Sequence, residues 1–453
     1  MREKRLSRLV LAALLGLTPM LAAAESGIPR LDFTDTRLEN GLRVIIAPDH
    51  SAPVVAVAVT YDVGSRSERP GRTGFAHLFE HMMFQGSENV GKGEHFLLVF
   101  NNGGGMNGTT HEDFTDYYQV MPKNQLDLAL FLEGDRMRSL AVNQANLDNQ
   151  RNAVQEERRL GIDNQPYGKA YLEIDNLAYD NFAYKHSTIG YMADLDAANL
   201  QDLKDFFRVY YAPDNALLSI VGDVDPQVAL EKVKKYFGII PSQAVPKAPD
   251  LSEPEHYGER REVIDDPLAR LPMLLMAYHT PPGNTPENDA ALVLANILGS
   301  GRSSRLYQHL VKDKQVATQV QVQADWRIGP SLFYILAIPR PGVKLEDLEK
   351  AIDEETDAVK KDGITVRELE KARTQFRRNI IQSRQSALTT AIRLGEYTVK
   401  FNDPNLINTA YDKLRAVTAE QVQEFAQKYL IERTRAVVYD LPAKPAQKSA
   451  AGR

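Results

Sequence analysis

Two histidines and a glutamate lie within about one helical turn of each other near the start of this chain, in the segment HLFEH at residues 77–81. The run around them is typical of a helix, so His77 and His81 share one face and Glu80 borders it, because a helix turns once in 3.6 residues. Imidazole is a common zinc ligand, and a catalytic zinc takes three protein ligands and keeps one position for water. The pattern therefore predicts a zinc site that needs one more ligand, with Glu80 left for proton transfer.

The order His-x-x-Glu-His reverses the zinc signature His-Glu-x-x-His and is known from zinc peptidases. So short a motif also occurs by chance in 453 residues, and it then marks a helix with two surface histidines. A later predicted helix, residues 147–160, offers Glu156 and Glu157 as third ligands. Neighbours on a helix point about 100° apart, so only one of the two can face a metal, and a paired glutamate on a charged helix is usually a solvated face.

The flanking segments predict the elements that hold these residues. Asn40-Gly41 favours the turn of a β-hairpin, and residues 54–61, which are rich in β-branched side chains, predict a central strand just before the histidine helix. After that helix, a glycine-rich turn leads into a strand that ends at Tyr118. Because its small residues let another backbone approach, this strand predicts either an edge to which a peptide adds or a plain hairpin turn.

The later part of the chain repeats the order of the first. Residues 202–221 predict a helix, a turn and a buried strand, and residues 424–439 repeat that order with aromatic residues at the same spacing. A strand at 271–278 and a helix at 290–298 correspond to the central strand and the histidine helix, but the second helix has no pair of ligands. We therefore predict an α+β fold of two homologous α/β-sandwich-like repeats, each an antiparallel-rich sheet covered by helices.

The start of the chain and the region between the repeats predict the domain boundaries. Four basic residues, an apolar run over 9–21 and three alanines at 22–24 are typical of a secretory signal peptide, and four prolines at 241–254 indicate a linker. The predicted units are a signal peptide at 1–24, an N-terminal zinc-binding domain at 25–240, a linker at 241–256, a C-terminal domain without zinc at 257–441 and a disordered tail at 442–453.

The composition limits which cellular compartment and which classes of binding partner are compatible with the chain. The chain has 54 Lys plus Arg, 60 Asp plus Glu and no cysteine. Loss of residues 1–24 removes four basic residues and one acidic residue, which leaves a net charge of about −9. A charge of this sign argues against a nucleic-acid partner. After the signal, no segment approaches the roughly 20 apolar residues of a spanning helix. We expect a periplasmic protein with no membrane span, or alternatively a secreted one.

Three motifs together carry a family resemblance: HLFEH, the glycine-rich stretch from Gly103 to Tyr118, and NAVQEE at 152–157. In this order and at these separations they resemble the pitrilysin and insulysin family of inverted zinc metallopeptidases, over residues 36–440. The similarity is to the short-chain branch, which includes mitochondrial processing peptidases and bacterial two-subunit zinc peptidases. The family's third ligand is a glutamate in a Val-x-x-Glu context, which Glu157 matches. The resemblance thus implies one zinc per chain, bound by His77, His81 and Glu157.

The resemblance also implies roles for neighbouring residues. Asn107, Gly108 and Thr109 correspond to the family's substrate-binding edge strand, although Gly108 stands where alanine is more common. Gln150 corresponds to a position that is acidic in many relatives, and we expect it to tune zinc affinity from outside the ligand set. The implied activity is that of a zinc endopeptidase acting on extended peptides or unfolded segments, with Glu80 activating the water. The alternative is a structural or peptide-binding chaperone subunit of the same fold.

One departure from the family predicts a partner. Zinc-less halves that complete catalysis usually carry an arginine and, seven residues later, a tyrosine, which bind the tetrahedral intermediate. Val311 and Thr318 occupy these two positions here, and the nearby Arg305 and Tyr307 have the wrong separation. We therefore expect a heterodimer in which a homologous zinc-less subunit supplies the arginine and tyrosine, with a homodimer as the second choice.

Overall fold

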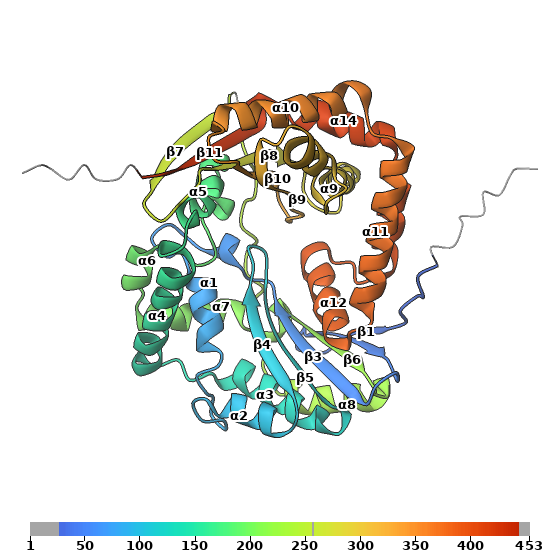
Figure 1. The fold of residues 1–453 in the computed structure, drawn as a ribbon. Helices are drawn as coiled ribbons and strands as arrows, with labels where there is room; N and C mark the ends of the chain where they lie inside the picture. The colour runs from blue at the N-terminus through green and yellow to red at the C-terminus, as the bar shows by residue number, and fades with distance from the viewer. Residues whose placement is uncertain (1–26, 256–257, 444–453) are drawn as a thin grey trace, which may run out of the picture.

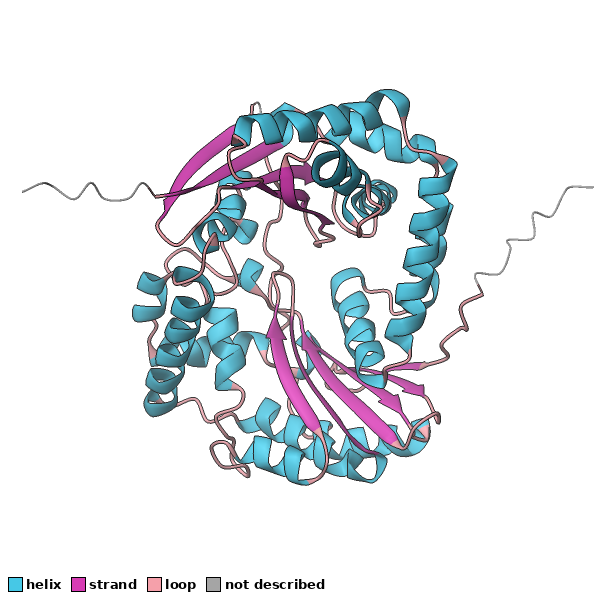
Figure 2. Cartoon of the chain, viewed as in Figure 1, coloured by secondary structure: helices cyan, strands magenta, loops and turns pink. Residues whose placement is uncertain are grey.

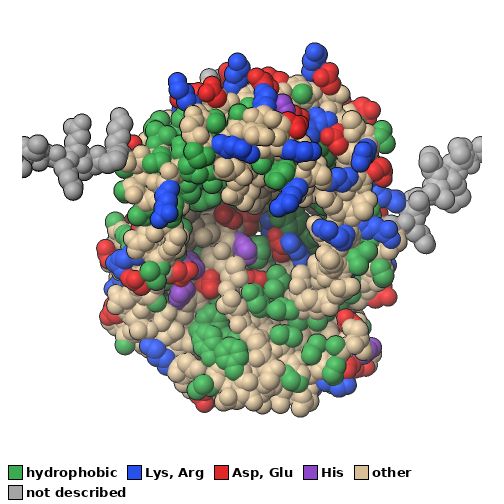
Figure 3. Space-filling view, in the orientation of Figure 1, with side chains coloured by type: hydrophobic (Ala, Val, Ile, Leu, Met, Phe, Trp, Pro, Cys, Tyr) green, Lys and Arg blue, Asp and Glu red, His purple; other side chains and the backbone are tan. Residues whose placement is uncertain are grey.

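The structure is a computed structural model that describes residues 27–255 and 258–443. Its two halves each contain one β-sheet (Figures 1 and 2), and the molecule is hollowed between them in the space-filling view (Figure 3). A cavity of about 550 Å³ in this region is lined by side chains from both halves. The predicted signal peptide and residues 444–453 of the predicted tail lie outside the described residues.

The first sheet has six strands in the order β1-β2-β6-β3-β5-β4. They are β1 (Thr34–Arg37), β2 (Arg43–Pro48), β3 (Val54–Tyr61), β4 (Gly105–Thr110), β5 (Thr115–Pro122) and β6 (Ala216–Gly222). Strands β2 and β6 pair parallel, and the other neighbours pair antiparallel. The central strand β3 has the predicted bounds, because its valines and alanines suit burial on both faces. Strand β4 is an edge of this sheet.

The second sheet has five strands in the order β7-β11-β8-β10-β9. They are β7 (Arg260–Asp266), β8 (Met273–Thr280), β9 (Ala317–Ala324), β10 (Ser331–Pro339) and β11 (Arg435–Pro442). Only β7 and β11 pair parallel, so from β2 to β4 and from β7 to β9 the two sheets have the same topology. The predicted repeat is confirmed. The sheet also includes Pro442, the first residue of the predicted tail, which pairs with Asp266.

Fourteen α-helices cover the two sheets in the described part of the chain. The first eight are α1 (Phe75–Met82), α2 (Glu94–Asn101), α3 (Leu126–Ser139), α4 (Gln144–Arg158), α5 (Gly168–Ala178), α6 (Met192–Asp196), α7 (Leu200–Tyr210) and α8 (Pro226–Phe237). The other six are α9 (Pro286–Gly299), α10 (Leu345–Asp362), α11 (Val366–Arg384), α12 (Ala387–Phe401), α13 (Leu406–Ala416) and α14 (Ala419–Tyr429). Among these described helices, none is both long enough and apolar enough to cross a bilayer.

Each half gives one helix to the sheet of the other half. Helix α12 lies on the inner face of the first sheet, where Ala391 and Leu394 join a buried cluster with Ala56 and Ala58 of β3 (Figure 1). Helix α5, which belongs to the first half by sequence, packs against β7, β8 and β11 of the second sheet. Burial of apolar area by both crossing helices stabilises the two halves against separation.

Candidate metal centre

Helix α1 has one apolar face and one polar face. Leu78, Phe79 and Met82 are buried in the main core of the first half, beneath the sheet. The opposite face carries His77 and His81, whose ring centroids are 4.8 Å apart. Because residues four apart lie one turn apart on a helix, both imidazoles point toward α4, which packs against α1. The structure thus brings the two predicted histidine ligands together.

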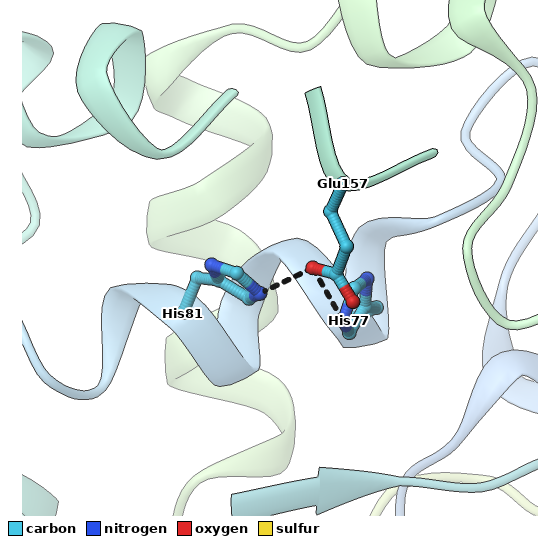
Figure 4. Close-up of side chains that lie close together, drawn as sticks. All are labelled: His77, His81 and Glu157. Carbon is cyan, nitrogen blue, oxygen red and sulfur yellow. Dashed lines mark ion pairs between the residues drawn. The ribbon is translucent and has the colours of Figure 1, made fainter. Parts of the chain in front are cut away.

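Glu157, near the end of α4, faces both histidines (Figure 4). Its Oε2 atom lies 3.2 Å from Nε2 of His81 and 3.6 Å from Nε2 of His77. Glu156 points elsewhere and pairs with Arg159 on the helix surface. Of the two glutamates that the sequence offered, the structure therefore places only Glu157 at the histidine pair.

The three donor atoms fit a tetrahedral zinc ion. One ligand atom from each of His77, His81 and Glu157 lies within 4.8 Å of the other two, and no other group of three such residues occurs in the described chain. Donors that bind one tetrahedral zinc at 2.0–2.2 Å are roughly 3.3 to 3.6 Å apart. The two distances to Glu157, 3.2 and 3.6 Å, lie within or close to this range, and two imidazoles with one carboxylate form a known catalytic donor set.

Local electrostatics set the charge of the donors. Burial, together with the neighbouring His81, lowers the pKa of His77 to about 4, so its imidazole is neutral at pH 7. Burial also lowers the pKa of His81, but the hydrogen bond and charge of Glu157 and the charge of Glu80 outweigh this effect and raise it. The hydrogen bond with His81 holds the pKa of Glu157 below its usual range. The site therefore offers a neutral imidazole at His77 and an ionised carboxylate at Glu157 at neutral pH.

Gln150 contacts the histidine pair from the preceding turns of α4. Its side-chain oxygen lies 3.3 Å from Nδ1 of His81, and its amide nitrogen donates to Asn149 at 2.6 Å. With Nδ1–H donating to Gln150, Nε2 of His81 carries the free lone pair that a metal requires. The amide of Gln150 is thus in a position to fix both the ring orientation and the tautomer of His81.

Glu80 lies between α1 and the edge strand β4. It is 9% exposed, and the hydroxyl of Thr110 donates to its Oε2 at 2.8 Å. Burial raises the pKa of the Glu80 carboxyl against the effect of that hydrogen bond. Thr110 leaves Oε1 as the oxygen that can accept another proton.

The predicted substrate strand is an exposed edge beside this glutamate. Asn107, Gly108 and Thr109 lie in β4, which pairs only with β5 in the described chain. A Cβ atom at Gly108 would lie 3.1 Å from Cγ of Glu80, so the absence of a side chain allows the helix and the strand to approach closely. Asn107 is exposed and Thr109 half-buried, and both lie on the face of β4 opposite to Gly108, because successive residues of a strand alternate between its faces.

The residues at the arginine and tyrosine positions are engaged within the second half. Val311 packs against the core of that half, and the hydroxyl of Thr318 donates to the carbonyl of Ile338 at 3.1 Å. Arg305 forms ion pairs with Glu355 and Glu368. None of these residues is part of the cluster of His77, His81 and Glu157.

Sequence reasoning missed Thr110, which holds Glu80. The signal was available, because Thr110 lies two residues after Gly108 and so shares its face of β4. It also missed Glu68, which contacts the start of α1, and His186, which pairs with Glu68 across 118 positions of sequence. No periodic pattern links residues so far apart.

Comparisons with known proteins agree with this fold and with a zinc peptidase. Residues 43–189 match the family model described as "Insulinase (Peptidase family M16)", and residues 197–376 match the "Peptidase M16 inactive domain". The zinc protease PqqE of Helicobacter pylori is 33% identical over 85% of this chain and 89% of its own. A probable mitochondrial-processing peptidase subunit beta of Arabidopsis thaliana is 22% identical over 94% of this chain and 82% of its own. A crystal structure of a protease from Helicobacter pylori superposes with a TM-score of 0.87 at 31% identity, over 91% of this chain and all of that chain.

The fold and the donor cluster define a metallopeptidase of the two-repeat type. The chain belongs to the M16 family of peptidases, the insulinase and pitrilysin family, and is a zinc protease. The family resemblance drawn from the three sequence motifs is confirmed.

Proposed function

We propose that the chain is a zinc-dependent endopeptidase in which His77, His81 and Glu157 bind one zinc ion and Glu80 acts as general base. The observation that carries this proposal is the convergence of three donor atoms within 4.8 Å beside a buried carboxylate. A zinc ion bound there would supply Lewis acidity, which lowers the pKa of water and polarises a carbonyl. Gln150, through its contact with His81, is the residue that we expect to tune zinc affinity.

The chain's own residues account for proton transfer and substrate orientation. Thr110 holds Oε2 of Glu80, so Oε1 accepts the proton of the attacking water and delivers it to the leaving amine. A substrate would pair with the free edge of β4 at Asn107, Gly108 and Thr109, which requires an extended backbone. Extended peptides and unfolded segments meet that requirement, whereas compact folded proteins do not.

Hydrolysis of a mixed library of unstructured peptides, with bound zinc measured in the same samples, tests this activity. The isosteric variant Glu80→Gln should keep its zinc and lose hydrolysis by roughly 10²- to 10⁴-fold, the usual contribution of a general base. If Glu80→Gln cleaved as fast as the wild type, Glu80 would not be the base. Equal peptide binding by both proteins with no cleavage by either, also after addition of a zinc-less partner that carries the arginine and tyrosine, would instead favour the peptide-binding or chaperone role.

We infer further that the active enzyme is a heterodimer with a homologous zinc-less subunit. Val311 has no polar side chain and the hydroxyl of Thr318 already donates to the carbonyl of Ile338, so neither residue offers an oxyanion a free donor, and a second copy of this chain would not supply one either. The Arabidopsis relative is itself named as one subunit of a processing peptidase. Cleavage by the zinc-loaded chain only after addition of a partner with the arginine and tyrosine is the expected result. Full cleavage by the chain alone would overturn this assembly and leave the zinc site unaffected.

The periplasm is the proposed compartment. The basic, apolar and small-residue order of residues 1–24 supports export, and the absence of cysteine makes the fold independent of disulfide formation. Cell fractionation should find the mature chain with periplasmic markers; recovery from the culture medium would support secretion.

A further inference from the structure

A buried carboxylate outside α1 caps the start of that helix. The amide N–H of Gly74 donates to Oε2 of Glu68 at 2.8 Å, and the amide N–H of Ala76 donates to Oε1 at 2.8 Å. Gly74 is the N-cap residue of α1, has φ of 81° and offers no side chain to cap the helix. Glu68 therefore satisfies donors that the helix itself leaves free, one of them on the residue directly before His77.

His186 holds this carboxylate from the other side. Its Nδ1–H donates to the carbonyl of Phe182 at 3.0 Å, and its Nε2 lies 2.9 Å from Oε2 of Glu68. The side chains of Glu68 and His186 are 0% and 1% exposed. Burial lowers the pKa of His186, but the hydrogen bond and charge of Glu68 outweigh it and raise that pKa. With a proton on Nε2, the two side chains form an ion pair sealed from water.

The segment that follows His186 also contacts α4, the helix that carries Glu157. The guanidinium of Arg158 donates to the carbonyl of Gly190, and the amide of Gln155 donates to Asp196 at 2.6 Å. Asp194 in the same segment accepts from the amide and the hydroxyl of Thr73, just before α1. One segment, residues 186–196, thus contacts both α4 and the turn that leads into α1.

We propose that Glu68 and His186 are positioning residues, which fix α1 relative to α4 so that His77 and His81 meet Glu157 at zinc-binding distance. This inference rests on the zinc site proposed above and assigns no catalytic contact to either residue. A hydrogen bond to a charged group contributes more than a neutral one, and a buried carboxylate deprived of its partner is costly. Loss of the ion pair between Glu68 and His186 should therefore disturb the start of α1 first. Ala76, which donates to Glu68, directly precedes the ligand His77.

The test compares metal sites rather than activity alone. Zinc release from the loaded full chain to excess chelator, and the d–d absorption of the cobalt(II)-substituted chain, are measured for the wild type and Glu68→Gln. In the variant, only the amide oxygen can accept a hydrogen bond. Its N–H groups would face donors that now contact the second carboxylate oxygen of Glu68, and these donors would lose their acceptor. We expect release to be about tenfold faster, similar to the loss of other residues that orient metal ligands, and the cobalt bands to shift. Unchanged release and spectrum would overturn the proposal.

Two histidine variants separate hydrogen bonding from general disruption. His186→Gln keeps an N–H donor for Glu68, so its cobalt spectrum should stay closer to the wild type than that of His186→Ala, which leaves the carboxylate unpaired. Equal spectra for these two variants, both matching the wild type, would count against a role for His186.

Glu349→Gln is the matched control. Glu349 is also a buried carboxylate in a hydrogen-bonded cluster, with Arg261 and Tyr439, but it lies in the second half. This variant should lose stability without changing the cobalt spectrum. If it showed the same spectral shift as Glu68→Gln, that shift would reflect general destabilisation, and the proposal would be overturned. A wild-type chain that takes up no cobalt or zinc would overturn the zinc site and the positioning role together.

Discussion

The two halves of the molecule have the same strand order but differ in how a helix packs beside the edge strand. In the first half, α1 lies next to β4, and Gly108 of the strand gives room to the carboxylate of Glu80. In the second half, α9 lies next to β9, and Gly299 at the end of the helix gives room to Val322 of the strand, where a Cβ would be 2.6 Å away. The contact between α1 and β4 leaves polar atoms beside the edge of the first sheet. The contact between α9 and β9 is filled by apolar side chains.

This difference shows that the fold alone does not provide the chemistry. Helix α9 buries eight residues, seven of them apolar, and has no histidine, whereas α1 has its two histidines on the face that meets α4. The hollow between the halves is bordered by histidine and acidic side chains on the side of the first half (Figure 3). The second half contributes support and a wall, in agreement with its match to the inactive domain of the family.

Removal of the third donor should have the largest effect, because it takes a ligand from the half that binds the metal. Glu157→Gln should lose zinc affinity by more than the roughly 10- to 100-fold that residues outside the ligand set contribute. Glu156→Gln is the matched control, because Glu156 pairs with Arg159 instead of the histidines. Equilibrium dialysis measures both. If the two variants lost equal affinity, Glu157 would not be a ligand.

A smaller effect is expected at Gln150. Gln150→Ala should lower zinc affinity by about tenfold, because His81 loses the acceptor that fixes its Nδ1–H. Competition with a zinc-binding dye provides the measurement, and Gln144→Ala, at an exposed position earlier in α4, serves as control. An affinity equal to the wild type would show that His81 is oriented without this contact.

One methyl group added at Gly108 tests the close approach between β4 and Glu80. In Gly108→Ala the new Cβ would be 3.1 Å from Cγ of Glu80, so the side chain of Glu80 must shift by a few tenths of an ångström. Because alanine is the more common residue here in the family, we expect kcat to fall by only about two- to threefold, with less change in KM. Gly105→Ala on the same strand meets no atom within 4 Å and should leave kcat near the wild-type value. Steady-state kinetics on one unstructured peptide distinguishes them; equal kcat values would mean that the spacing at Gly108 has no catalytic role.

The smallest effect concerns stability in the second half. Asp440 is 0% exposed, neither carboxylate oxygen has a hydrogen-bond partner in the described chain, and burial with the charge of Asp266 raises its pKa to about 7. Because this pKa is above the ~3.9 of an unfolded chain, the folded state loses stability as pH rises from about 4 to 7. Asp440→Asn should therefore raise the free energy of unfolding by roughly 1–2 kcal/mol at pH 8 and by little at pH 4.5.

Denaturant unfolding at both pH values measures this change. Asp265→Asn, at an exposed neighbouring position, controls for the loss of one negative charge. A gain for Asp440→Asn that is the same at both pH values would contradict the assignment.

Features of the fold and the site that depend on a local residue pattern could be predicted from the sequence. The bounds of β3 followed from its β-branched residues, and the shared face of His77 and His81 followed from helical periodicity. Helix α9 begins four residues before its prediction, because Thr285 caps the helix and Pro286 occupies its first position, two signals that the sequence contained.

What the sequence could not predict depends on contacts between distant segments. The exchange of α5 and α12 between the sheets is decided by which faces pack together, not by the propensity of either helix. Spacing alone left Glu156 and Glu157 open, and the family resemblance selected Glu157 before the geometry did. Glu68 and His186 carry no mutual spacing signal, so only their contact in the fold associates them with α1.

The central claim is that one half alone holds the metal. Zinc content of the purified full chain, combined with X-ray absorption at the zinc edge, tests it most directly. We predict one zinc per chain with two imidazole nitrogens and carboxylate oxygen among its donors, and none in the double variant His77→Ala/His81→Ala. Zinc retained at one per chain by that double variant would place the metal elsewhere and contradict the account.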